Sequence, residues 1–365
     1  MSARDDISTE GIQALRDQLW TAVTGRDEFR AAEAVFAALE NGWDAESVLL
    51  DLIAPVQAKV GAEWAANRLS VAQEHAASAI AERVVAALAH HPSLRTPSPR
   101  GRITVACVEQ EWHVLPARLL AEVLTLRGWQ VDFLGAQVPT PHLIAHLHSN
   151  GADAVALSSS IPTRLPTAHA AITACQAIGV PVLVGGAAFG PDGRYARLLG
   201  ADAWAPDARA AAQQLADGIP QRSLATGRQQ IDDLPHLADQ EYTLVARSLG
   251  RLVGEVLAQL EDRFPAMASY SVHQRERTAE DIAHIVEFLG VALYTDDDDL
   301  FTTFVIWTAG ILTARHVPAD SLHPALNVLA DQLKDFPRST RLLDRARSAL
   351  DGAPVTAGAH PGVPA

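Results

Sequence analysis

Between Arg102 and about Gln213, the chain alternates short apolar segments with segments of helical periodicity, and this alternation constrains the fold more than any other feature. The segments occur in the order Ile103–Val108, Pro116–Arg127, Gln130–Leu134, Pro141–Ser149, Ala154–Ser158, Leu165–Ile178, Val182–Val184, Tyr195–Leu199 and Ala203–Trp204. Strands that alternate with helices form a parallel sheet with helices on both faces. The sequence therefore predicts a doubly wound parallel-sheet domain of the α/β class over residues 101–217.

Glu111 and His113 follow the first predicted strand, at the edge where parallel sheets bind their ligands. Because one residue separates them, the carboxylate can fix the orientation and the proton of the imidazole while the other ring nitrogen faces a metal ion. The same two residues also occur in ordinary polar loops. Their role therefore depends on what the rest of the fold places beside them.

Small residues end two further predicted strands. Ser158 and Ser160 lie at the end of the third strand, and Gly185 and Gly186 follow the fourth. Together they would leave a slot along the carboxyl edge of the sheet, wide enough for a flat or rod-shaped group. Each pair alone also fits a polar strand end or a simple turn. The two glycines are not a dinucleotide fingerprint, because the third glycine at the required spacing is missing.

Residues 1–95 have helical periodicity and predict a small helical bundle. A capping-box signature after the break at Asn67–Ser70 should restart a helix. This break would let the indole of Trp64, at the end of one helix, face Glu74 and His75 in the first turns of the next. The alternative is a core tryptophan beside a solvated helix face, which is the usual place of Glu and His side chains.

Residues 234–352 are again helical in pattern, after a polar linker at Gly218–Asp233, and predict an all-α domain. The segment Thr278–Asp281 matches a capping box and should begin a helix. Asp296–Asp299 are expected to be an acidic helix start, favoured by the helix dipole, rather than a metal site. Residues 353–365, rich in Pro, Gly and Ala, are expected to be a disordered tail.

Charge and cysteine content exclude several classes of protein. The chain of 365 residues has 29 Lys and Arg against 43 Asp and Glu, a formal net charge of −14, so direct nucleic-acid binding is not expected. Cys107 and Cys175 are the two cysteines, which leaves no disulfide framework and no Cys-rich metal site. No apolar run approaches the ~20 residues of a membrane span, and no signal sequence is recognisable. We therefore expect a soluble cytoplasmic protein that does not bind membranes.

In combination, the candidate residues resemble the cobalamin-binding module of the CarH-like photoreceptors. The residues that carry the resemblance are Trp64, Glu74, His75, Glu111, His113, Ser158, Ser160, Gly185 and Gly186. The resemblance covers roughly residues 8–213. It implies that the bundle of residues 1–95 caps the upper face of a corrin ring, with the Rossmann-like cobalamin-binding domain beneath it.

The resemblance also implies a role for each group of residues. His113 would be the lower axial ligand of cobalt, in place of the benzimidazole of cobalamin, and Glu111 would be its hydrogen-bond partner. The displaced nucleotide tail would lie in the slot between the serines and glycines at the ends of the third and fourth strands. Trp64, Glu74 and His75 would shape the pocket of the upper ligand, which in this family is 5′-deoxyadenosyl.

The sequence departs from the relatives in three respects. Many cobalamin modules have a glycine three residues after the ligand histidine, whereas Pro116 stands there in this chain, so the turn must close differently. Ala65 stands beside Trp64, where some light-sensing relatives carry a second histidine that captures cobalt after photolysis, so that photoproduct is not expected here. The helix-turn-helix that precedes the bundle in those regulators has no room in this chain, which again argues against direct DNA binding.

Three segments of the C-terminal region, Thr278–Leu289, Asp299–Phe301 and Trp307–Val317, are similar to globin-like sensor helices. Attached to a cobalamin module, they resemble the photocobilins, which hold a bilin beside the cobalamin. A bilin such as biliverdin, or another linear tetrapyrrole, needs an apolar slot, cations for two propionates and a polar group for its pyrrole nitrogens. Residues of these types are Tyr270, His273, Arg275, Arg277, His284, Tyr294 and Trp307. Because no cysteine follows Cys175, such a bilin would be bound non-covalently. The alternative is a plain helical dimerisation or signalling domain.

The leading functional hypothesis is a light sensor, not an enzyme. Photolysis of adenosylcobalamin, directly or through a bilin, would change the arrangement of domains in an expected homo-oligomer and signal to a partner protein. The alternative is a corrinoid protein that carries methyl groups in a methyltransferase system. A further alternative is an interaction scaffold that binds no corrinoid. Fold alone does not separate these hypotheses.

Overall fold

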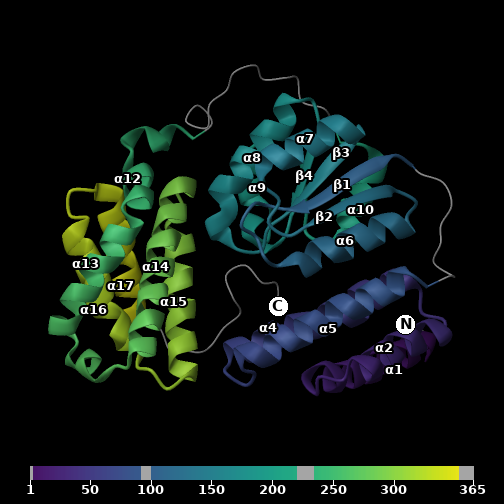
Figure 1. The fold of residues 1–365 in the computed structure, drawn as a ribbon, viewed down its shortest axis with the longest axis horizontal. Coiled ribbons are helices and arrows are strands. Elements are labelled where there is room, and N and C mark those ends of the chain that lie inside the picture. The colour runs from purple at the N-terminus through teal and green to yellow at the C-terminus, as the bar shows by residue number, and fades with distance from the viewer. Residues whose placement is uncertain (1–2, 92–99, 220–233, 353–365) are drawn as a thin grey trace. The chain divides into compact units, whose positions relative to one another are not determined.

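The computed structural model describes residues 3–91, 100–219 and 234–352, which form two compact units (Figure 1). The first unit contains the N-terminal helices and a sheet domain, and the second contains the C-terminal helices. The predicted tail at residues 353–365 and most of the predicted linker at Gly218–Asp233 lie outside the described residues. None of the described helices has the length and apolar character needed to cross a membrane.

The predicted N-terminal bundle is confirmed. Its helical segments are α1 (Ala3–Thr24), α2 (Glu28–Glu40), α3 (Ala45–Ser47), η1 (Val48–Ile53), α4 (Ala54–Ala65) and α5 (Val71–Ala89). The π-helical segment η1 comes directly before Pro55, so this proline lies in the first turn of α4 and interrupts no regular helix. The predicted capping box at the start of α5 is also present: Ser70 Oγ accepts from Gln73 N, and Gln73 Oε1 accepts from Ser70 N.

The sheet domain has five parallel strands in the order β2-β1-β3-β4-β5. The strands are β1 (Arg102–Cys107), β2 (Gln130–Gly135), β3 (Ala154–Ser158), β4 (Val182–Gly185) and β5 (Ala203–Ala205). The helical segments between and after them are α6 (Val114–Leu126), α7 (Thr140–Asn150), η3 (Pro162–Arg164), α8 (Leu165–Ala177), η4 (Ala187–Phe189), α9 (Arg194–Leu198) and α10 (Ala208–Asp217). The predicted alternation is confirmed. The strand order reverses between β1 and β3, and such a switch point is where doubly wound sheets bind ligands.

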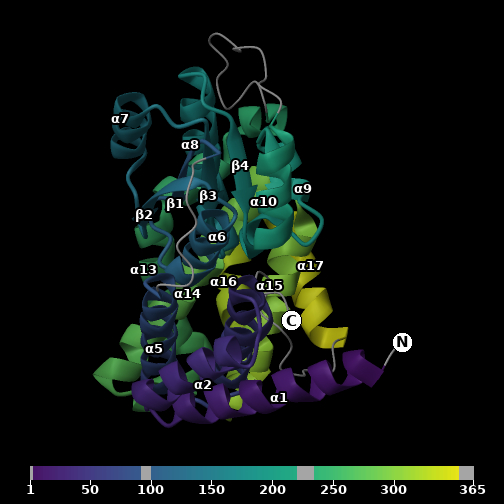
Figure 2. The ribbon, with the colours of Figure 1, turned by 90° about the vertical axis from the view of Figure 1, so that its right-hand side faces the viewer.

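Helix α6 joins the sheet domain to the bundle. It packs on β1 and β2 and also contacts α3, η1 and α5, and it lies against the bundle in both views (Figures 1 and 2). Arg127 after α6 makes two hydrogen bonds to Glu46, and Arg209 of α10 makes two to Asp51. Buried side chains of the bundle and of the sheet also belong to one apolar cluster. The end of the bundle at α3 and η1 is therefore tied to the sheet domain.

The C-terminal unit is all-helical, as predicted, while its globin-like identity stays a prediction. Its segments are η5 (Pro235–Asp239), α12 (Glu241–Arg247), α13 (Leu249–Arg263), η6 (Pro265–Ser269), α14 (Val272–Thr295), α15 (Asp298–Ala314), η7 (Ala319–Ser321), α16 (Leu322–Gln332) and α17 (Pro337–Gly352). The expected helix start at Thr278 is wrong, because α14 begins at a capping box of Ser271 and Gln274. Thr278 lies inside the helix, where its hydroxyl donates to the Gln274 carbonyl.

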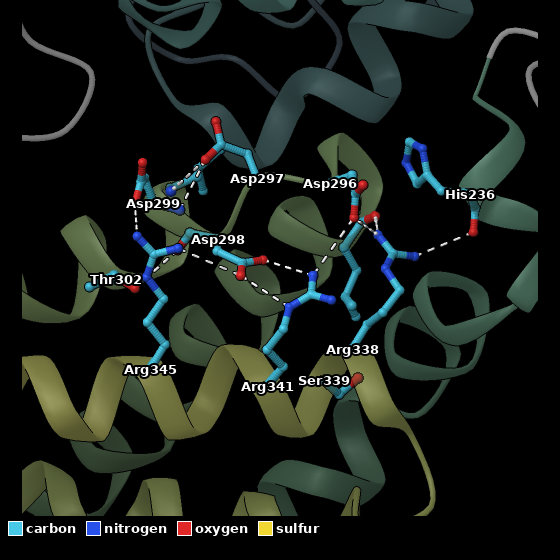
Figure 3. A network of polar contacts seen from close by, with 12 residues as sticks. His236, Asp296, Asp297, Asp298, Asp299, Thr302, Arg338, Ser339, Arg341 and Arg345 are labelled. Carbon is cyan, nitrogen blue, oxygen red and sulfur yellow. Dashed lines mark hydrogen bonds and ion pairs between the residues drawn. The ribbon is translucent and has the colours of Figure 1, made fainter.

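The expected acidic helix start at Asp296–Asp299 is confirmed (Figure 3). The Asp297 carboxylate accepts from the backbone N–H groups of Asp299 and Leu300 and so caps α15. Asp298 receives two hydrogen bonds from Arg341 of α17, and Asp299 pairs with Arg345 one turn further along (Figure 3). These carboxylates are therefore used in capping and in ion pairs between helices.

Candidate functional site

Glu111 and His113 lie in the turn between β1 and α6, and the structure brings them into contact. His113 is the residue that precedes the first turn of α6. Its backbone N–H and its ring Nδ1 both bond to Glu111 Oε1, at 2.9 and 2.7 Å. The Glu111 side chain is fully buried, whereas that of His113 is 55% exposed. Because Nδ1 is engaged by the carboxylate, Nε2 is the nitrogen left to face a ligand.

Glu111 is held in turn by the end of β3. Its Oε2 accepts from the Ser160 backbone N–H at 2.7 Å and from the Ser159 hydroxyl at 3.1 Å. Ser158 belongs to β3 itself, and its carbonyl accepts from Val108 N at 3.0 Å. The sequence singled out the serines on either side and missed Ser159. The uninterrupted run of three serines was the feature of the sequence that could have indicated Ser159. The alternation of side chains along a strand does not say which hydroxyl turns toward a neighbouring strand.

The charges of the pair support each other. Burial raises the pKa of the Glu111 carboxyl, but the hydrogen bonds from His113 and Ser160 outweigh that effect and lower it to about 2. The bond to Glu111 raises the pKa of His113, burial opposes this rise, and the charge of Glu74 adds to it. Glu111 is therefore an ionised acceptor that keeps the proton of a neutral imidazole on Nδ1 and the lone pair on Nε2.

Gly185 and Gly186 form a close backbone contact at the end of β4. Gly186 has a φ of +96°, and a Cβ there would lie 2.3 Å from the Ser159 carbonyl oxygen, so only glycine fits. A Cβ on Gly185 would lie 3.4 Å from the Ala205 carbonyl oxygen. The predicted small residues therefore lie where the backbones at the ends of β3 and β4 approach each other closely.

The bundle residues of the prediction lie at the junction of α4 and α5. Trp64 is half-buried in the last turn of α4. In the first turns of α5, Glu74 Oε2 lies 2.5 Å from His75 Nδ1, and Glu74 Oε1 accepts from the Ser78 hydroxyl at 2.7 Å. The Glu74 charge acts on the pKa of His113, so this carboxylate lies within electrostatic range of the imidazole. Glu74 of the bundle therefore acts electrostatically on His113 of the sheet domain.

The donor set fits a metal that brings its own ligands. Among the described residues, no three His, Cys, Asp or Glu side chains are arranged to hold a metal ion. His113 Nε2 has no hydrogen-bond partner within that part of the chain. A single oriented imidazole suits cobalt in a corrin ring, which already has four equatorial nitrogen ligands. Cys107 adds nothing here, because burial raises the pKa of its thiol to about 12.

Four of the residues proposed for a bilin lie near the start of α14. Tyr270 packs edge-on against Phe264, and Arg275 pairs with Glu261 and bonds to the Met267 carbonyl. The exposed side chains of His273 and Arg277 pair with Glu276 and Glu280, each three residues further along their own helix. These side chains are therefore engaged in local contacts.

The other three lie further along α14 and on α15. His284 pairs with Glu287, Tyr294 is buried against Tyr242, and Trp307 packs near Phe304. Along α14, His273 and Tyr294 are separated by about 30 Å at the usual helical rise. The structure therefore does not gather the predicted bilin residues into one place.

Comparisons with known proteins agree with the geometry of the first unit. Residues 101–216 match the family model described as B12 binding domain, and residues 15–89 match a second model of the same description. These segments correspond to the sheet domain and to the bundle. The second model includes Trp64, Glu74 and His75, and the first includes Glu111 and His113.

Two curated relatives come from Myxococcus xanthus. The HTH-type transcriptional repressor CarA is 30% identical over 180 residues, which are 48% of this chain and 58% of the relative. The HTH-type transcriptional repressor CarH is 33% identical over 146 residues, which are 38% of this chain and 46% of the relative. The chain thus spans about half the length of the curated relatives it matches.

A solved structure, the monomethylamine corrinoid protein of Methanosarcina barkeri, is also similar. It is 21% identical, with a TM-score of 0.49, and the match covers 55% of this chain and 96% of that one. The assignment rests on the two family models, the first of which includes Glu111 and His113. Residues 15–89 and 101–216 form the two parts of a B12-binding domain, and the chain is a cobalamin-binding protein.

Proposed function

We propose that this protein is a light sensor that binds adenosylcobalamin between the bundle and the sheet domain. The observation that carries the proposal is the Glu111–His113 pair at the switch point, with Glu74 of the bundle within electrostatic range of it. The similarity to CarA and CarH, at 30% and 33% identity, supports an origin shared with regulators rather than with enzymes alone. In this proposal the protein is not an enzyme.

His113 would hold cobalt through Nε2, and Glu111 would fix the ring by accepting its Nδ1 proton. Bound adenosylcobalamin would supply a cobalt–carbon bond that light cleaves. Trp64, Glu74 and His75 would contact the upper ligand, so their packing would depend on whether that ligand is present. Such a difference in contacts is what shifts a two-state equilibrium.

The ion pairs between the domains indicate which end of the bundle would move. Arg127 and Arg209 hold Glu46 and Asp51 at the α3 and η1 end through bidentate contacts. The turn between α4 and α5 contains an ion pair of its own, between Arg68 and Glu63. Loss of the upper ligand would therefore displace the α4–α5 turn, and a homo-oligomer or a partner protein would detect the change.

A non-covalently bound bilin, such as biliverdin, is the second part of the proposal. An aromatic cluster on α14 and α15 supports it: Phe288 stacks on Phe304 with centroids 3.7 Å apart and ring planes 6° apart, and Trp307 lies 6.2 Å from Phe304. Phe288 and Phe304 are buried, so Trp307, which is partly exposed, is the ring of this cluster that a tetrapyrrole would contact.

Polar groups lie next to this cluster. His284 lies one turn before Phe288 on α14, and the charge of Asp281 acts on both His284 and Arg315. His284 and Arg315 would supply cations for the propionates, and Asp281 would supply a carboxylate for the pyrrole N–H groups. Of the residues predicted from the sequence, His284 and Trp307 remain as the proposed bilin contacts. Titration of the full chain with biliverdin tests this part, and an absorption spectrum identical to that of free biliverdin would contradict it.

The experiment that tests the main proposal is reconstitution of the full chain with adenosylcobalamin and, separately, with methylcobalamin. We expect tight binding of adenosylcobalamin and a spectral change under green light. In His113→Ala the axial imidazole is lost, so the absorption bands of the bound cobalamin should change. His142→Ala removes an exposed histidine of the same domain and serves as the control.

The outcomes separate the alternatives. Binding of methylcobalamin in clear preference to adenosylcobalamin would favour a methyl-carrying corrinoid protein of a methyltransferase system. Binding of adenosylcobalamin with no spectral response to green or red light would contradict the sensor. Identical spectra for wild type and His113→Ala would contradict the axial role of His113.

A further inference from the structure

A chain of hydrogen bonds links α4 to the glutamate of the candidate site. Gln57 Nε2 of α4 donates to Ser78 Oγ of α5 at 2.6 Å. Ser78 Oγ donates to Glu74 Oε1 at 2.7 Å, and the other carboxylate oxygen lies 2.5 Å from His75 Nδ1. The Gln57 and Ser78 side chains are partly buried. We name Gln57, Ser78 and Glu74 the relay.

The hydrogen bonds of the relay all donate in one direction, from Gln57 through Ser78 to Glu74. A serine hydroxyl has a single proton, and Ser78 uses it toward the charged Glu74 carboxylate while its lone pair accepts from the Gln57 amide. A hydrogen bond to an ionised acceptor is stronger than a neutral one, and a second bond behind it polarises it further. One oxygen of Glu74 is thereby fixed, and the other stays turned toward His75.

Gln57, the relay residue on α4, lies on the same face of that helix as Trp64. Gln57, Gly61 and Trp64 are spaced by four and three residues, which places them on one side of a helix. A Cβ added to Gly61 would meet no atom within 4 Å. Between the amide of Gln57 and the indole of Trp64, the helix face is therefore left without a side chain.

We propose that Gln57 and Ser78 are positioning residues for the upper ligand of cobalamin. They hold the Glu74–His75 pair in the orientation that favours an upper ligand with hydrogen-bonding groups over one without them. The inference rests on the proposed function and extends it to residues that the resemblance does not include. An adenosyl group has hydroxyl and amine donors that an oriented carboxylate can accept, whereas a methyl group has none.

The binding test compares two upper ligands in variants of the full chain. Ser78→Ala and Gln57→Met remove the relay bonds, Ser78→Thr keeps the hydroxyl, and Thr24→Ala removes a bundle hydroxyl that bonds only to the backbone of α1. Ser78→Ala and Gln57→Met should weaken adenosylcobalamin binding about tenfold, the size of one lost charge-assisted bond. Methylcobalamin binding should change less than twofold, and Ser78→Thr and Thr24→Ala should resemble wild type.

A second readout needs no cofactor. In the apo protein with isotope-labelled histidine, the ring signals of His75, assigned with His75→Gln, should shift in Ser78→Ala and return in Ser78→Thr. This follows because the freed carboxylate no longer holds a fixed position at Nδ1. The signals should stay unchanged in Thr24→Ala.

The results have distinct meanings. Equal weakening for both cobalamins, or no weakening for either, would overturn the positioning role, as would unmoved His75 signals in Ser78→Ala. Failure of the wild-type chain to bind adenosylcobalamin would instead contradict the proposed function. In that case a shift of the His75 signals would still show that the relay orients the pair, while the proposed selection of the upper ligand would be wrong.

Discussion

Glu111 Oε1 accepts two hydrogen bonds from His113, one from the backbone N–H at 2.9 Å and one from ring Nδ1 at 2.7 Å. One oxygen thus fixes both the position of the residue and the orientation of its ring. The other oxygen is anchored to β3 through Ser159 and Ser160. Glu111 therefore links the His113 ring to the end of β3.

Glu111→Gln should weaken cobalamin binding by about 10- to 100-fold, the usual effect of losing the partner of a metal-bound histidine. The neutral amide oxygen is a poorer acceptor, and it no longer supports the imidazole by its charge. Titration of the apo protein, followed by absorption, measures the affinity. Glu109→Gln is the matched control from the same turn, where Glu109 accepts only a long bond from Thr140 N at 3.3 Å. Equal affinities for wild type and Glu111→Gln would contradict the role.

The stability of the apo protein should fall in acid because of Glu111. Its pKa is lowered to about 2, so its contribution is fully present above the ordinary value near 4.5 and is lost as pH falls through about 2. The shift corresponds to a contribution on the order of 3 kcal/mol, shared with His113. The difference in unfolding free energy between wild type and Glu111→Gln should therefore narrow between pH 5 and pH 3. A constant difference in urea unfolding would contradict this expectation.

The raised pKa of His113 changes stability with pH in the direction opposite to that of Glu111. Its contribution is present below the ordinary value near 6.5 and is lost as pH rises through the folded value, because the charged ring is the form that Glu111 favours. Cobalt binding needs the unprotonated ring. The affinity for cobalamin should therefore fall as the pH drops below the pKa of His113 in the folded protein. In Glu111→Gln this fall should begin at a lower pH. Affinity curves with the same midpoint in both proteins would contradict the assignment.

Gly186→Ala should be strongly destabilising. The added methyl group would lie 2.3 Å from a carbonyl oxygen, on top of the strain of a φ of +96°. Gly135→Ala is a useful control at the end of β2, since Gly135 also has a positive φ, +79°, but its Cβ would meet nothing within 4 Å. Thermal unfolding should show a loss of about 1 kcal/mol for the control and clearly more for Gly186→Ala. Equal losses would mean that the strand ends do not pack as described.

Arg338→Ala should destabilise the C-terminal unit by about 3 kcal/mol. The side chain is 14% exposed and bonds to the carbonyls of His236 and Leu293 and to the carboxylates of Asp239 and Asp296 (Figure 3). Its loss would leave the two carbonyls without this donor and, among the described residues, would leave Asp296 only its 3.9 Å pair with Arg341. Arg341→Ala removes a neighbouring arginine that is 53% exposed, and it should cost 1 kcal/mol or less, as a rough guide. Denaturant unfolding of the full chain compares the two variants. A smaller effect for Arg338→Ala than for Arg341→Ala would contradict the description of this network.

Local sequence patterns determined the helices and strands of this protein. The alternation from Arg102 onward predicted the parallel sheet, and the Ser70 to Gln73 capping box predicted the start of α5. Glu111 and His113 were found because a contact between residues two apart depends mainly on the chain between them. These features depend on periodicity and on short-range hydrogen bonds, both of which are present in the sequence itself.

Contacts between distant segments were decided by the tertiary structure. Ser159 lies 48 positions from Glu111, and Gln57 lies 21 positions from Ser78, so no local pattern relates them. The residues proposed for a bilin were chosen by chemical type, and the structure spreads them from Tyr270, before α14, to Trp307 on α15. Composition does not say which face or turn of a helix a side chain occupies. The sequence by itself therefore determined the elements and the Glu-His pair, whereas packing of the strand ends and of α4 against α5 decided which side chains support them.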